Sequence, residues 1–341
     1  MKTDMPLSRP IRLFVNQTEE LLDQEITLLR NPEADQNGTL VDVYTFNIEK
    51  NVILFPPHYT GLLKDFIIAR HCVNLLIKGA AAKKSRYLVC SFTGDSVFKG
   101  IHQIYIDALK DEAKKAKKLP VQKLIRMLNI LYTNFNNDIN EFPWNPITNA
   151  CVYHRIPQIR KTQLYYLMKE GKRDMDEMME YEDVIPRRYF VLNKSMFYAR
   201  DQYLAKTLPA DQLMPVINIP QMKKFNHLEV KEMLTTRWTQ TSWYQSKVFG
   251  DNMLEIMEKY LQKIDWNAEP TLDYFHEIYQ SGVRMTNHFI SYMSMNDWYV
   301  WEPPRHLLEA QKQKAEYEHA ALKRIFGDLI GDLPADNLSE L

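Results

Sequence analysis

The sequence predicts a mainly α-helical protein that begins with a small α+β region. Apolar residues recur at spacings of three and four through most of the 341 positions, which is the pattern of helices that bury one face. Convincing strand-like segments, rich in β-branched and aromatic residues, occur only before residue 93. The 10 glycines are few and suit long helices better than hairpins. We therefore expect a small sheet of about three strands, followed by a helical domain.

The N-terminal region supplies one helix and the strand candidates. Thr18 can cap a helix over 18–30, which ends at Asn31-Pro32. The polar loop NPEADQNG follows this helix. The strand candidates share a β-branched and aromatic composition and comprise 39–46, 51–55 and 86–92.

Helical spacing dominates the remainder of the chain. The segments that show it are 96–117, 120–139, 158–181, 243–264, 272–293 and 304–326. Residues 185–204 are ambiguous, because their first part has a strand-like composition and their second half a helix-like one. The prolines of EFPWNP (141–146) interrupt the helical period. We therefore divide the chain into an N-terminal α+β region, 1–145, and a C-terminal helical domain, 146–341, with a frayed tail.

Charge and cysteine content restrict the class of protein. The 43 basic residues balance the 43 acidic ones, so no global field attracts nucleic acid or an anionic membrane. Cys72, Cys90 and Cys151 are sparse and odd in number, which does not suit a disulfide framework, and we expect reduced thiols. The sequence shows neither a signal peptide nor an apolar run of about 18 residues. We expect a cytoplasmic location and no membrane partner.

The stretch FIIARHCVNLLI (66–77) places an arginine and a histidine inside an apolar helix. At about 100° per residue, Arg70 falls at the edge of the main apolar stripe and His71 on the far side with Lys64 and Lys78. Because apolar residues cover most of the circumference, this helix is predicted to be central and packed on several sides. A guanidinium that faces a core needs a partner, so Arg70 predicts a carboxylate or carbonyl from a remote segment.

The simpler interpretation of Arg70 is a structural ion pair, and the alternative is an anion-binding arginine. For His71, a surface or hydrogen-bonded histidine is simpler than a catalytic one. An enzyme would use a polar pocket between the two regions, with Arg70, His71, His154 and Arg188 as candidate residues.

Recognised catalytic and metal motifs do not accompany these residues. H-E-x-x-H, G-x-S-x-G and the Gly-rich phosphate loops are absent from the sequence. Cys151 and His154 have the C-x-x-H spacing of half a zinc site, but a strong signal requires two such pairs. No metal site is therefore favoured, and no cofactor is predicted.

Three further groups of residues are candidates for binding. The basic segment 110–126 offers Lys114, Lys115, Lys117 and Lys118 to nucleic acid, although a solvated helix end is the simpler interpretation. An aromatic group (Trp298, Tyr299 and Trp301) and a methionine face (Met175, Met178 and Met179) are candidate protein contacts. An inter-helix corner and core filling are the simpler interpretations of these two.

Together these patterns favour a soluble intracellular interaction or assembly subunit, with a protein partner or self-association. The absence of catalytic signatures and the long amphipathic helices place this function first. An enzyme with a polar pocket around Arg70 and His71 is the alternative, and a nucleic-acid binder that uses 110–126 is the second alternative.

Overall fold

The fold class predicted from the sequence is confirmed: helices dominate, and a small sheet lies near the N-terminus. The computed structural model describes residues 6–35, 37–46, 48–84, 94–110, 120–167, 169–170, 185–207 and 244–296. The sheet has the order β1-β3-β2. β3 (Asn51–Phe55) is the central strand, parallel to β1 (Ile26–Arg30) and antiparallel to β2 (Thr39–Val41).

The first helix lies earlier than predicted. α1 (Arg9–Leu22) has a proline in its first turn and ends at Asp23, which adopts a left-handed conformation with φ of 54°. The prediction of one helix over 18–30 is therefore wrong, because 26–30 forms β1. Leu22, Ile26 and Leu29 are spaced as on a helix, but pairing with β3 decides their conformation.

The segment 39–46 is only partly a strand, and Asp42 is the reason. β2 stops at Val41, and α2 (Val43–Phe46) follows as a single turn. The backbone N–H groups of Tyr44 and Thr45 donate to Asp42 Oδ1 at 3.1 and 2.8 Å, which caps that turn. The predicted strand 51–55 is confirmed, whereas 86–92 lies outside the described residues.

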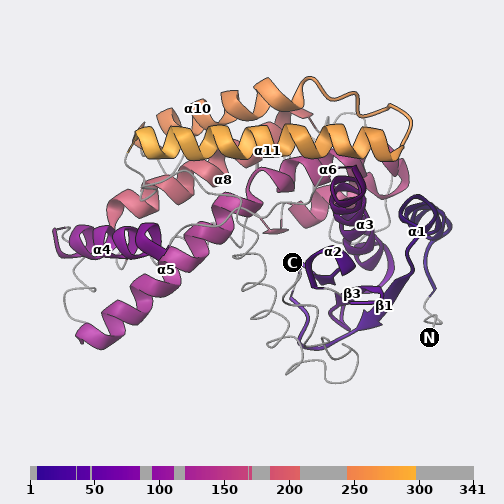
Figure 1. Ribbon diagram of the computed structural model, residues 1–341, viewed down its shortest axis with the longest axis horizontal. Coiled ribbons are helices and arrows are strands. Elements are labelled where there is room, and N and C mark those ends of the chain that lie inside the picture. Colours follow the sequence, from indigo (N-terminus) through magenta and orange to yellow (C-terminus); the bar gives the residue numbers. More distant parts are fainter. Residues whose placement is uncertain are drawn as a thin grey trace.

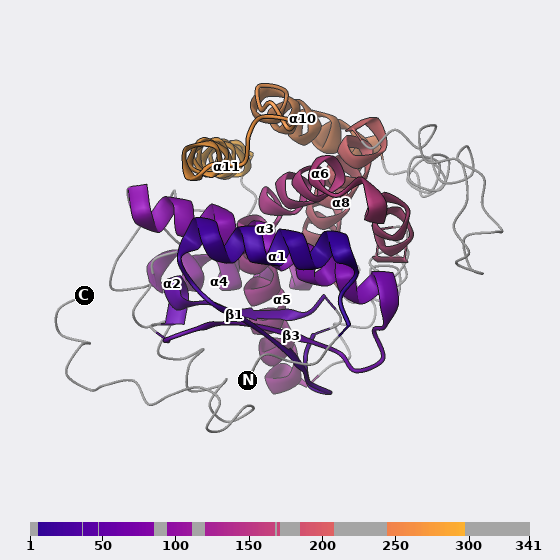
Figure 2. The same ribbon diagram turned by 90° about the vertical axis from the view of Figure 1, so that its right-hand side faces the viewer.

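α3 (Gly61–Lys84) is the central helix that the sequence predicts. It contacts α1, β3, α6 (Trp144–Arg155) and α11 (Leu272–Met295), which come from both halves of the chain. Figure 2 shows the sheet below α1 and α3, with α10 (Tyr244–Leu261) and α11 on the opposite side. Most of the α3 side chains are buried as a result.

The remaining helices extend the molecule away from the sheet (Figure 1). α4 (Gly94–Lys110) packs against α5 (Val121–Glu141) at one end, and α8 (Arg187–Thr207) packs along α10. A short 3₁₀ turn, η2 (Pro157–Ile159), precedes helical residues 160–167 and 169–170. The predicted helices 120–139, 243–264 and 272–293 are confirmed, with small differences at their ends. The ambiguous segment 185–204 is a helix, whereas 304–326 lies outside the described residues.

A single cluster of buried apolar side chains includes residues from both sides of position 145. The division of the chain at that position stays a prediction. Among the described helices, none combines the length and the apolarity needed to cross a membrane.

Candidate functional site

The loop between β1 and β2 is shaped by two short side-chain turns. Asn31 Oδ1 accepts a hydrogen bond from the backbone N–H of Glu33, and Asp35 Oδ1 accepts one from that of Asn37, both at 2.7 Å. Gly38 then adopts φ of 75° and lies against α3. A Cβ at this position would lie 2.7 Å from Ile67 Cγ2, so the close approach requires glycine.

This loop covers His71, which is only 8% exposed. His71 Nε2 lies 3.0 Å from the carbonyl oxygen of Asn37 and donates to it, which leaves Nδ1 as an acceptor with no hydrogen-bond partner. Burial first, and then the positive charges of Arg70 and Lys78, lower the pKa of His71 to about 3. The imidazole is therefore neutral at physiological pH.

Arg70 has the remote carboxylate partner that the sequence predicts. Its Nη1 lies 3.9 Å from Glu170 Oε1, and the two side chains are 13% and 7% exposed. The guanidinium carbon also lies 6.0 Å from the ring centroid of Tyr166. At this separation the ion pair is not a hydrogen bond, and Nη1 is buried without a hydrogen-bond partner.

Amide side chains from α6 and the following helical segment complete the polar interior. Asn149 Nδ2 donates to Asn145 at 2.9 Å (backbone oxygen) and 2.6 Å (Oδ1). Gln163 Nε2 donates to the backbone oxygen of Asn149 at 2.7 Å, and Gln163 Oε1 is buried without a hydrogen-bond partner. Both Asn149 and Gln163 are fully buried. These bonds fix residues 160–170 against α6.

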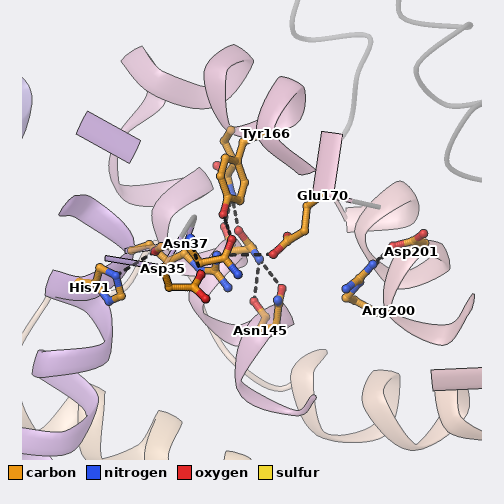
Figure 3. Close-up of polar contacts among 11 residues, drawn as sticks. Asp35, Asn37, His71, Asn145, Tyr166, Glu170, Arg200 and Asp201 are labelled. Carbon is orange, nitrogen blue, oxygen red and sulfur yellow. Dashed lines mark hydrogen bonds and ion pairs between the residues drawn. The ribbon is translucent and has the colours of Figure 1, made fainter. Parts of the chain in front are cut away.

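Tyr166 connects its helical segment to the loop between β1 and β2, because its hydroxyl donates to Asn37 Oδ1. In Figure 3, Tyr166 and Glu170 point from their helical segment toward Asn37 and Asn145. We call these residues the Arg70 cluster. Contacts join Asn37, Arg70, His71, Tyr166 and Glu170 to one another, and the amides Asn145, Asn149 and Gln163 form a separate set of hydrogen bonds within the cluster. The sequence reasoning missed all of these except Arg70 and His71. The loop NPEADQNG was the signal available, because its asparagines and glycine mark a shaped turn.

The other two predicted catalytic candidates lie elsewhere. Arg188 Nη1 lies 3.5 Å from Asp107 Oδ2, which joins α8 to α4. His154, near the end of α6, stacks on Trp266 with ring centroids 6.3 Å apart. Arg70 and His71 thus have the neighbours described above, and His154 and Arg188 have other partners; the catalytic role of these four residues stays a prediction.

The cysteines give the weak zinc candidate no support. Burial raises the pKa of the Cys72 and Cys151 thiols to about 12, so neither is a ready thiolate. Nowhere in the described ranges do three or more His, Cys, Asp or Glu side chains gather in a group fit to hold a metal ion. The pair Cys151 and His154 therefore lacks further ligands there, and Cys90 lies outside these ranges.

Several predicted binding residues also lie outside the described residues. They are the aromatic group Trp298, Tyr299 and Trp301, the methionine face Met175, Met178 and Met179, and the lysines Lys114, Lys115, Lys117 and Lys118. Comparison of the chain with protein-family models, curated proteins and solved structures finds no match. The case for a function therefore rests on the geometry of this chain.

Proposed function

We propose that the Arg70 cluster binds a small polar ligand that carries an anionic group, which makes the chain an enzyme or a ligand-binding protein. The proposal rests on Arg70 Nη1. This atom is buried, makes no hydrogen bond and lies 3.9 Å from Glu170 Oε1. Charge-assisted hydrogen bonds to carboxylates are normally about 2.7–2.9 Å long. An oxygen of a ligand carboxylate or phosphate would supply the missing acceptor.

Two acceptors of the same cluster support this proposal. His71 Nδ1 and Gln163 Oε1 are buried and make no hydrogen bond. Buried polar groups without partners are uncommon in folded proteins, and a bound molecule is one physical reason for them. An anionic ligand that also carries hydrogen-bond donors would match one cationic donor and two neutral acceptors.

A purely structural role is the competing explanation. In that role the cluster would only attach the loop 31–38 and residues 160–170 to α3. The two explanations predict different stabilities for the double variant Arg70→Met with Glu170→Gln. A long, buried ion pair contributes little to stability, so a ligand site should lose no stability when both charges are removed. A structural network should lose stability and show no response to small molecules.

The experiment is a thermal-shift comparison of the wild type, Arg70→Met and the double variant. The probes are inorganic phosphate, free amino acids and short carboxylic acids. At a hundredfold excess over its Kd, a binding compound should stabilise the wild type by about 2.7 kcal/mol and leave Arg70→Met unchanged. Arg12→Met, on the exposed side of α1, is the matched control and should keep the response. Equal stabilisation of wild type and Arg70→Met, or no stabilisation by any probe, would refute the proposal.

An interaction or assembly subunit is the second candidate, and one surface of α4 favours it. Phe98 and Leu109 are 72% and 48% exposed and lie on one helical face, because they are eleven residues apart. His102 stacks on Phe98, with ring centroids 6.4 Å apart, and extends this face. The exposed residues Lys99 and Lys110 flank it. The partner that fits is an amphipathic helix with acidic edges.

The test of this second candidate is recovery of partner chains with the wild type and with Phe98→Ser. Ile130→Ser, at another exposed apolar position (52%) on α5, is the control. A stoichiometric partner that is lost with Phe98→Ser and kept with Ile130→Ser supports the surface. Equal recovery with both variants would count against it.

Three further features are proposed for this chain. Nucleic-acid binding through 110–126 is the second alternative, and it predicts a steep fall in affinity with salt. A cytoplasmic location and reduced thiols complete the proposal, and both suit the sparse cysteines.

A further inference from the structure

A second group of cationic side chains lies at the C-terminal end of α6, apart from the Arg70 cluster. The Arg155 guanidinium carbon is 4.8 Å from the ring centroid of Tyr274, and that of Arg160 is 4.3 Å from the ring centroid of Tyr153. His154 lies between the rings of Tyr153 and Trp266, with centroid separations of 5.4 and 6.3 Å. We call these residues the Arg155 cluster: Tyr153, His154, Arg155, Arg160, Trp266 and Tyr274.

Within the described ranges, no ion pair balances the positive charge of this cluster. Neither Arg155 nor Arg160 forms a salt bridge with any acid in the described part of the chain. Arg155 Nε and Nη2 are buried without hydrogen-bond partners, while Arg160 Nε donates to the backbone oxygen of Tyr153 at 2.7 Å. Asp265 is a described acid that raises the pKa of both His154 and Tyr274, and its Oδ1 accepts a hydrogen bond from the backbone N–H of Asn267 at 3.0 Å.

Stacking decides which part of each guanidinium is available. The guanidinium carbons of Arg155 and Arg160 lie over phenol rings, Arg160 Nε already donates to Tyr153, and the Arg155 side chain hydrogen-bonds to Tyr274. The remaining N–H groups are the donors that a ligand could use. In-plane N–H pairs match the oxygen spacing of phosphate and carboxylate groups. Two such cations with one neutral histidine suit a doubly charged oxyanion better than a single carboxylate.

We propose that the Arg155 cluster binds the phosphate group of a small molecule, with Arg155 and Arg160 as the ligands of the phosphate oxygens. This site does not depend on the Arg70 cluster, which lies toward the other end of α6. The Tyr274 and Tyr153 rings hold the two arginines, and His154 contributes a ring nitrogen at the edge of the site.

His154 offers a direct readout of binding. Burial first, and then the charge of Arg160, lower the pKa of His154, while the Asn267 side chain and Asp265 act in the opposite direction. An anion held by the arginines would offset part of their effect and raise the pKa of His154. His288 is the internal control, since burial and Lys259 lower its pKa on a different helix pair.

The experiment is an NMR titration of the histidine side chains, with increasing inorganic phosphate in one series and acetate in another. His154→Gln identifies the resonance, and Arg155→Met combined with Arg160→Met removes the proposed ligands. Phosphate should raise the pKa of His154 in the wild type, with half-saturation on the order of 1 mM, and leave His288 unchanged. Acetate at equal ionic strength should have a smaller effect.

Three outcomes would overturn the inference. The first is no change of His154 with phosphate, and the second is an equal change in the double variant. The third is an acetate response as large as the phosphate response, which would show that the site does not select a phosphate group. Near-ultraviolet circular dichroism of the double variant establishes that it is folded, and the conservative pair Arg155→Lys with Arg160→Lys should restore part of the response.

Discussion

The two arginine clusters hold their charges by different means. Arg70 lies inside the molecule near Glu170, and fully buried amides and a neutral imidazole complete its cluster. Arg155 and Arg160 lie against aromatic rings and form no ion pair within the described ranges. Within the described residues, an opposite charge therefore lies beside Arg70, and none pairs with Arg155 or Arg160. Substitutions should therefore be costly where they unbalance a buried pair and mild where no pair exists.

Glu170→Ala should have the largest effect, because it leaves the Arg70 guanidinium buried without a counter-charge. We expect a loss of about 3 kcal/mol in the free energy of unfolding, at the lower end for a buried pair because Arg70 keeps some exposure. Denaturant unfolding measures it. Glu25→Ala removes the acid of an exposed pair with Lys50 and should leave the transition midpoint unchanged. Equal midpoints for both variants would mean that the ion pair of Arg70 and Glu170 does not contribute to the free energy of unfolding.

Gly38→Ala tests how closely the loop 31–38 must approach α3. Gly61→Ala is a matched control, because both glycines have positive φ (75° and 57°) but only Gly38 has atoms within 4 Å of an added Cβ. The control should lose about 1 kcal/mol from backbone strain alone. Gly38→Ala should lose about 2 kcal/mol in total, the excess over the control coming from the contacts with Ile67 and His71. Similar losses in the two variants would show that the loop adapts without cost.

Acid should destabilise the protein through His71. The pKa of His71 is lowered from 6.5 to about 3 in the fold, so between these pH values the unfolded chain binds a proton that the folded chain does not. The free energy of unfolding therefore falls as the pH drops below 6.5. At pH 5.5 the loss relative to neutral pH is roughly 1.4 kcal/mol, because the folded His71 stays unprotonated there. His71→Gln should flatten the dependence of unfolding free energy on pH. His154→Gln should flatten it less, because its side chain is only partly buried.

Arg155→Met should have the smallest effect. The change removes a cation–π contact with Tyr274 and unpairs no acid of the described residues, so we expect less than about 1 kcal/mol of destabilisation. Denaturant unfolding of Arg155→Met and Glu170→Ala under the same conditions compares their losses in the free energy of unfolding. A loss as large as that of Glu170→Ala would mean that Arg155 balances a charge in the fold, which would remove the contrast between the two clusters.

Local rules predicted the parts of this fold that depend on one segment. The period of residues 66–77 placed α3 in the centre, and the desolvation of Arg70 required a partner before any partner was known. The same rules failed at 26–30, where helical spacing and strand composition coexist. The parallel pairing with β3 makes this segment a strand. That pairing cannot be predicted from the residues of the segment alone.

The Arg70 cluster shows the same limit. Glu170, Tyr166 and Asn37 are brought to α3 by two segments that are remote in the sequence from it and from each other. Asn and Gln side chains are common on protein surfaces, so burial of Asn149 and Gln163 could not be inferred from their type. His71 lies under the loop that carries Asn37 and Gly38, and this cover was not anticipated from the sequence.

The position of α3 has a consequence for the motions of the protein. The sheet lies on one side of this helix and α6 and α11 lie on the other, while α1 packs alongside it, so its amides are released only when these layers separate. Hydrogen exchange at residues 66–77 should therefore require the global unfolding free energy, whereas the ends of α4 and α10 open locally. Slow exchange at α3 would make it the last element to lose its structure. A substitution that leaves the exchange of α3 unchanged would then act only locally.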